Sequence, residues 1–165
     1  GHPLPQGPLR HRWSPCGSGG DRSPRPHHQL RGTPLSKSDY LETALCNWIK
    51  GTTMPAAPAG LYVALFNGDP TDTGAAGTDV TATLRVAGRV AVTFGAISGG
   101  GTMSNSAIVN FGNAAGGATV SHFGIYNFAT NGNLLGSGSI GGGPQAITAG
   151  TAVSFAAGAL VWTED

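Results

Sequence analysis

The clearest pattern in the chain is a short run with helical spacing near residue 40. Its apolar positions recur at intervals of three and four residues: Leu41, Ala44, Leu45, Trp48 and Ile49. This spacing puts them on one face of a helix. Ser36 or Ser38 can cap the start of the helix, and Gly51 can end it. We therefore predict one amphipathic helix over about 38–50.

Beyond Pro58 the spacing of apolar residues falls to two, and turns rich in Gly, Asn and Asp separate short runs. Eight runs indicate strands: 61–66, 89–96, 107–111, 119–128, 134–140, 146–148, 151–156 and 159–163. In the second run Val90, Val92 and Phe94 share one face. Short strands without intervening helices predict an all-β fold. We expect an antiparallel β-sandwich or jelly roll over residues 36–165 that carries the one short N-terminal helix.

Residues 1–35 differ in composition from the rest. They hold seven of the 11 prolines and four of the five histidines, and five arginines against Asp21 alone. Proline removes backbone donors, and so few apolar side chains do not offset the entropy of ordering the segment. We predict an extended arm outside the core, so that deleting it leaves the β domain folded. Two interpretations stay open: a basic arm that reaches an acidic neighbour, either a subunit or packaged nucleic acid, and a non-native leader.

Composition narrows the classes of function. Charged residues make up only 10% of the chain and the formal net charge is +1, so no general field attracts nucleic acid or an acidic membrane. No stretch of about 18 apolar residues occurs. We expect no membrane partner, and nucleic acid only through the arm. Cys16 and Cys46 are too few for a disulfide framework, and whether they pair stays open.

One cluster of carboxylates follows the first predicted strand, in Asp69-Pro70-Thr71-Asp72 and then Asp79. Paired carboxylates can bind calcium or share a proton. The same residues make a strong turn, because Asp side chains bond nearby backbone amides and Pro presets φ. The spacing of a calcium loop is missing, so we favour the turn.

Catalytic and metal chemistry has little support, since His122 is the one histidine of the predicted domain. A catalytic base needs a nucleophile and an orienting group, and a metal usually needs more than one nitrogen or sulfur ligand. The glycine runs at 99–101, 116–117 and 141–143 are not followed by Lys-Ser/Thr, so they indicate turns instead of phosphate loops. We predict no catalytic residues, no cofactor and no metal.

Six segments together carry a resemblance: YLETAL at 40–45, LYVALF at 61–66, DPTD at 69–72, RVAVTFGA at 89–96, VSHFGIY at 120–126 and NLLG at 133–136. In order and spacing this set resembles a family of small virion proteins of tailed phages. Its members are often labelled tail-fibre proteins, and some look like capsid decoration proteins. The resemblance covers about 36–165. It implies a structural role in the virion and brings no catalytic residues to this chain.

The residues and the resemblance agree on a non-enzymatic structural protein of the phage virion. A β domain of low charge without a convergent polar site buries its surface best against copies of itself or a lattice. The preferred role is a head decoration (cement) protein on the capsid surface, bound to the major capsid protein and to its own copies. The alternatives are a tail-fibre or tail-tip component bound to tail proteins and, third, a carbohydrate-binding β-sandwich.

Three aromatic residues are candidate contact residues: Trp48, Phe128 and Trp162. Each could equally belong to the core, an interpretation that we favour for Trp48 and Trp162. The carbohydrate alternative depends on three asparagines near Tyr126 and Phe128: Asn127, Asn131 and Asn133. Because the body has few charges, we expect association through apolar and backbone contacts that tolerate added salt.

Overall fold

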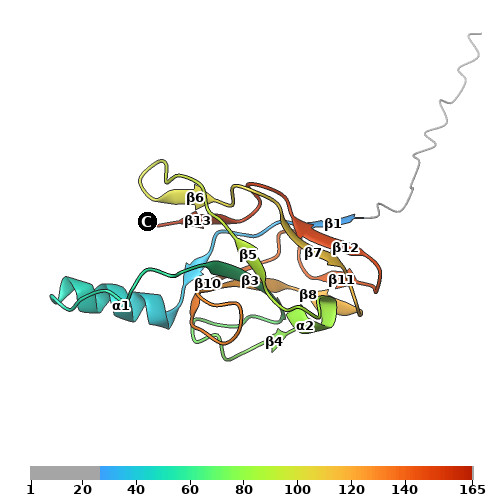
Figure 1. The fold of residues 1–165 in the computed structure, drawn as a ribbon, viewed down its shortest axis with the longest axis horizontal. Helices are drawn as coiled ribbons and strands as arrows, with labels where there is room; N and C mark the ends of the chain where they lie inside the picture. Colours follow the sequence, from blue (N-terminus) through green and yellow to red (C-terminus); the bar gives the residue numbers. More distant parts are fainter. Residues whose placement is uncertain (1–26, 165) are drawn as a thin grey trace, which may run out of the picture.

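A six-stranded sheet forms the larger layer of the molecule (Figure 1). The computed structural model describes residues 27–164 of the chain. The sheet runs in the order β2 (Ser36–Lys37), β10 (Leu134–Ser139), β9 (His122–Tyr126), β3 (Leu61–Asn67) and β4 (Thr78–Asp79), and β5 (Val90–Val92) also pairs with β3. Every pair in it is antiparallel.

Seven further strands of the described chain form three smaller sheets. They are β1 (His27–Leu30), β12 (Ala152–Phe155) and β7 (Val109–Asn113) in one sheet, β11 (Gln145–Ile147) with β8 (Ala118–Val120), and β13 (Val161–Thr163) with β6 (Thr102–Ser104). The β1–β12 pair is parallel, and the others are antiparallel. The predicted all-β fold of short antiparallel strands is confirmed.

The core lies between the six-stranded sheet and the sheet of β12. The ring of Phe123 on β9 meets that of Phe155 on β12 edge to face, with 5.6 Å between centroids. Phe111 on β7 packs on Phe155 in the same way, at 6.4 Å. All three rings are buried, where such contacts add to the burial of apolar area. The fourth predicted strand is broken at Ser121, and this break lets Val120 and Phe123 both face the core in spite of their odd spacing.

Residues 27–35 are here called the strap. They were predicted to be part of an arm outside the core, and the structure corrects this prediction. Two of its side chains, Leu30 and Leu35, are buried in the core, and β1 pairs with β12. The strap thus belongs to the folded domain, and the predicted boundary at residue 35 does not separate packed from unpacked chain. Deleting residues 1–35 takes two leucines from the core, so we now expect this deletion to destabilise the domain. Residues 1–26 of the predicted arm lie outside the described residues.

Backbone hydrogen bonds tie the strap to β10 and to the turn before β13. Gly32 N donates to the Ala159 carbonyl at 3.0 Å, and Thr33 N donates to the Ser139 carbonyl at 2.9 Å. A Cβ on Gly32 would lie 2.6 Å from the ring of the buried Phe123. Residue 32 therefore has to be glycine for the strap to approach the core this closely.

Helix α1 (Asp39–Ile49) is the predicted helix, and Ser38 is its cap. The Ser38 hydroxyl accepts from Leu41 N at 3.3 Å and donates to the Leu134 carbonyl of β10, which fixes the start of the helix on the six-stranded sheet. Its other end projects from the body, on the left of Figure 1. Among the described residues no helix is long and apolar enough to cross a membrane.

The remaining elements are short ones that the periodicity missed: β1, β2, β4, β6 and helix α2 (Thr81–Leu84). Each has two to four residues. So few positions do not show whether apolar residues repeat every two or every three to four residues.

Candidate functional site

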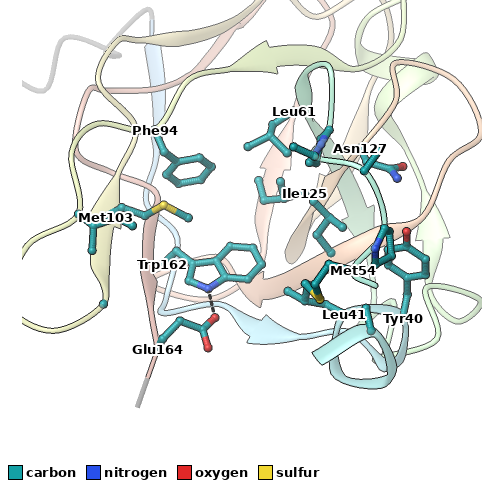
Figure 2. A pocket seen from close by; sticks show the side chains of 18 residues that line it. Tyr40, Leu41, Met54, Leu61, Phe94, Met103, Ile125, Asn127, Trp162 and Glu164 are labelled. Atoms are coloured by element: carbon teal, nitrogen blue, oxygen red, sulfur yellow. Dashed lines mark hydrogen bonds between the residues drawn. The ribbon is translucent and has the colours of Figure 1, made fainter. Parts of the chain in front are cut away.

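An apolar groove of about 500 Å³ lies beside the start of α1. Its floor comes from the middle of the six-stranded sheet, with Leu61 on β3, Ile125 on β9 and Leu135 on β10. Figure 2 shows Leu61 and Ile125 between two walls of side chains. A hollow of this volume falls within the ~300–1,000 Å³ typical of ligand pockets.

The two walls of the groove come from distant parts of the chain. Phe94, Met103 on β6 and Trp162 on β13 form one wall. Leu41 on α1 and Met54 after the helix form the other (Figure 2). The ring of Trp162 lies so close to β10 that a Cβ on Gly136 would come within 2.8 Å of it. The last strand thus returns to the end of the sheet where α1 begins, and this return creates the groove.

Glu164 is a charged group at the groove. Its carboxylate accepts from Trp162 Nε1 and from Lys37 Nζ, the latter at 2.6 Å. Desolvation opposes ionisation of this carboxyl, but the hydrogen bonds from Lys37 and Trp162 and the charge of Lys37 outweigh it, so the pKa of Glu164 is lowered from its ordinary value. The ionised carboxylate therefore helps to orient the Trp162 ring in the wall.

The segment between α1 and β3 forms the outer edge of the groove. Its lining residues are small or apolar: Met54, Pro55, Ala56, Ala57 and Pro58. All of them are exposed, and residues 53–59 make no hydrogen bond within the described part of the chain. This edge therefore presents apolar side chains to solvent on a backbone that no strand holds in place.

Past the groove, α1 carries apolar side chains that the described chain leaves partly exposed. Leu45, Trp48 and Ile49, here called the helix tip, are 37%, 58% and 72% exposed. Met54 lines both the groove and a hollow that Trp48 shares with Thr52 and Thr53, so Met54 lies between the groove and the tip. Trp48 thus lies outside the core, against the interpretation favoured from the sequence. Trp162 is buried, as expected.

Phe128, the third candidate contact residue, lies on the loop between β9 and β10 and is 56% exposed. Arg89 holds this loop, since its Nη1 donates to the carbonyls of Phe128 at 3.0 Å and of Asn131 at 2.6 Å. Its guanidinium carbon also lies 3.5 Å from the centre of the Tyr126 ring, as in a cation–π contact. Burial raises the pKa of the Tyr126 hydroxyl, against the lowering effect of the Arg89 charge.

The asparagines that hinted at a carbohydrate site serve this loop. Asn127 Oδ1 accepts from Asn133 N at 2.7 Å, and Asn131 has a φ of 54°. Asn adopts such a left-handed conformation more readily than most residues. The loop itself explains these residues, and the carbohydrate alternative keeps only the exposed ring of Phe128.

His122 lies on β9, with its Nδ1 3.0 Å from the Oγ of Ser121. That hydroxyl also accepts from Gly68 N at 2.7 Å, so it closes the irregular joint between β8 and β9. Neither residue lines the groove, and within the described chain no carboxylate bonds to the imidazole. The pair fits a histidine whose Nδ1 is paired with its neighbour in the strand joint.

The segment Asp69–Asp72 forms the predicted turn. Asp69 Oδ1 accepts from Thr71 N at 2.8 Å, and Thr71 has a φ of 58°. Asp79 has a similar local role, since its Oδ1 accepts from Thr81 N at 2.9 Å at the start of α2. These carboxylates stabilise backbone turns.

Potential metal ligands are dispersed in the described chain. Within residues 27–164, no group of three or more His, Cys, Asp and Glu side chains could hold a metal ion. Cys46 is exposed on α1, and Cys16 lies outside the described residues.

The fold and its surface define a small antiparallel β domain with an apolar groove and an apolar helix tip at one end. The chain belongs to the family described as Podophage GP4 fiber I protein gp80, which matches residues 36–163. This match confirms the resemblance to small phage virion proteins, with a description that names a fibre, and it places the chain among virion structural proteins. None of the curated proteins matches the chain. The strap lies just outside the matched residues.

Proposed function

We propose that the chain is a non-enzymatic structural component of a phage fibre and acts by assembling with virion proteins. The family match supports a fibre over other virion parts, because its description names one. The apolar groove and the exposed apolar helix tip near it are the structural observation behind an assembly role. Exposed apolar patches of this kind are typical of interaction sites.

Head decoration, the role preferred from the sequence, is the competing placement. A fibre component binds tail proteins and its own copies, whereas a decoration protein binds the major capsid protein. Both use an apolar surface, so the partner and the position in the virion distinguish them.

Location and copy number in purified virions test the proposal. Gold-labelled antibodies against the chain give its position, and quantitative mass spectrometry gives copies per virion. A fibre component labels the tail and is far less abundant than the major capsid protein. Label over the head at a copy number comparable to that of the capsid protein would show decoration. Absence from purified virions would contradict a structural role of either kind.

The absence of catalysis is part of the same proposal. Its support is local: the Ser121–His122 pair lacks a bonded carboxylate within residues 27–164, and Asp69 and Asp79 serve turns. Purified chain incubated with peptidoglycan and with capsular polysaccharide should release no fragments. Release that disappears in His122→Ala would contradict the proposal.

A further inference from the structure

The helix tip and the groove are two apolar surfaces at one end of the domain, and residues 27–164 leave both of them open to solvent. Trp48 and Ile49 lie on the projecting end of α1 (Figure 1). On the far lip of the groove Ile97 is 71% exposed. We propose that a second copy of the chain covers both surfaces, with the helix tip of each copy inserted into the groove of the other.

The tip cannot occupy the groove of its own copy. Helix α1 has 11 residues and is about 16 Å long at 1.5 Å per residue. Its first turns hold one groove wall through Leu41 and Ala44, and the tip lies on its last turns. A continuous helix does not bend its last turn into a hollow that its first turn lines. The tip therefore needs the groove of another copy.

The exposed areas suit a reciprocal pair. A Trp side chain buries up to about 250 Å², so Trp48 alone offers about 150 Å². With Leu45 and Ile49 the tip reaches the ~300–600 Å² of the largest apolar patch on a typical monomer. Two tips and two groove linings together approach the ~1,200–2,000 Å² of a specific interface, which one tip in one groove does not. Reciprocal insertion also gives the twofold symmetry that most homodimers have.

The charges at the two surfaces are complementary. Lys50 follows the tip as the C-cap residue of α1. Glu164 lies at the groove with its side chain 42% exposed, and it already binds Lys37. Insertion brings the cation of Lys50 toward this carboxylate.

The proposed dimer rests on the proposed structural role only in one respect: that role says what the dimer is for in the virion. Its test uses the purified full-length chain, and failure of that test leaves the location of the protein in the virion untouched. Labelling of virions decides the role, and self-association decides the interface.

Substitution of the helix tip is the first arm of the test. Sedimentation equilibrium should show the wild-type chain dimerising, and Trp48→Glu should weaken dimerisation by about 30-fold or more, as expected for an aromatic anchor. Phe128→Glu is the matched control, because Phe128 is 56% exposed but lies away from the groove lining. It should leave dimerisation unchanged. Circular dichroism checks that both variants fold.

Substitution of the groove is the second arm. Ile97→Glu should also prevent dimerisation, whereas Ile108→Glu, at an exposed isoleucine that does not line the groove, should not. A mixture of Trp48→Glu and Ile97→Glu chains should associate more tightly than either variant alone but more weakly than the wild type, because one of the two tip–groove contacts of the mixed pair is intact. If Ile97→Glu dimerises like the wild type while Trp48→Glu stays monomeric, the tips of two copies pack on each other. This result would overturn insertion into the groove.

Other occupants of the groove are outcomes of the same experiment. Residues 1–26 hold three bulky apolar side chains: Leu4, Leu9 and Trp13. Changing all three to Ser should leave dimerisation intact, and its loss would assign the groove to this segment instead. A wild-type chain that stays monomeric at its highest soluble concentration would overturn the second copy as the occupant.

Discussion

The strap and helix α1 show opposite relations between sequence pattern and burial. The strap has no periodic apolar pattern and lies in a stretch rich in Pro and Arg, yet Leu30 and Leu35 are buried in the core. Helix α1 has the clearest amphipathic pattern of the chain, yet Trp48 and Ile49 on its apolar face are exposed.

The cause of the difference lies in the neighbouring surface. Both layers of the domain meet over Leu30, because β1 pairs with β12 and the strap bonds to β10. Helix α1 is held at its first turn and then runs past the end of the six-stranded sheet. Periodicity shows which face of an element is apolar, but the reach of the neighbouring elements decides how much of that face is covered. An apolar stripe that outruns its own domain is therefore a sign of a partner.

Truncation of one leucine in each region is the strongest way to test this comparison. Leu30→Ala should lower the free energy of unfolding by about 2–5 kcal/mol, because it leaves a cavity in a closed core. Leu45→Ala removes the same atoms from a 37% exposed position and should cost less than about 1 kcal/mol. Urea unfolding of the two variants measures both values. Equal losses would show that the strap is not part of the cooperative unit.

The close approach of the strap to the core gives the next largest effect. Gly32→Ala places a Cβ 2.6 Å from the Phe123 ring, which is fully buried and packed against Phe155. Overpacking of this kind costs about 1–3 kcal/mol. Gly95→Ala is the control, because its nearest atom would be at 3.6 Å and the residue is exposed. Similar midpoints for the two variants in thermal unfolding would contradict the close packing of the strap.

The fold was largely predictable from the sequence, and the predictions that failed did so for physical reasons. Short apolar runs bounded by turns gave β3, β9 and β12, and helical spacing with a serine cap gave α1. The strap was missed because its two core leucines lie five positions apart with Gly32 and Pro34 between them, which fits neither a helix nor a strand period. A single residue, Ser121, broke a strand that looked continuous.

The candidate site was predictable only in part. Trp48 and Trp162 were singled out as large aromatics, but their burial depends on which element lies beside each of them. The groove unites Leu41 with Trp162, and no local pattern relates residues so far apart in the chain. Two prolines in the PAAP segment at 55–58 were a usable signal that the outer edge belongs to no strand, because proline has no backbone N–H to donate.

For helix α1, the comparison is tested at Ser38, the cap that fixes the start of the helix. Ser38→Ala removes the cap that accepts from Leu41 N and the bond to the Leu134 carbonyl. Loss of an N-cap costs about 1 kcal/mol, within a range of about 0.5–2. Ser36→Ala is the control, since Ser36 is exposed and does not cap the helix. Helical signal in circular dichroism, followed through urea unfolding, measures the change. Equal effects of the two substitutions would contradict the role of Ser38 as the cap.

The smallest effect is expected at the ion pair at the groove, between Lys37 on β2 and Glu164 after β13. Glu164→Gln keeps an oxygen that can accept from Trp162 Nε1 but removes the charge that pairs with Lys37. Because the side chains are 28% and 42% exposed, the variant should lose less than about 1 kcal/mol at pH 7. The unfolding free energies of the variant and the wild type are compared in urea.

The sign of the pH dependence follows from the lowered pKa of Glu164. A carboxyl with a lowered folded-state pKa stabilises the fold above its ordinary value of 4.5, and this contribution is lost as pH falls through the lowered pKa. The difference between wild type and Glu164→Gln should therefore be full at pH 6–7 and shrink below about pH 4.5. High salt at pH 7 should shrink it as well, because salt screens an exposed pair. If the difference grows as the pH falls, the pKa of Glu164 is raised in the folded state, and the assigned ion pair is contradicted.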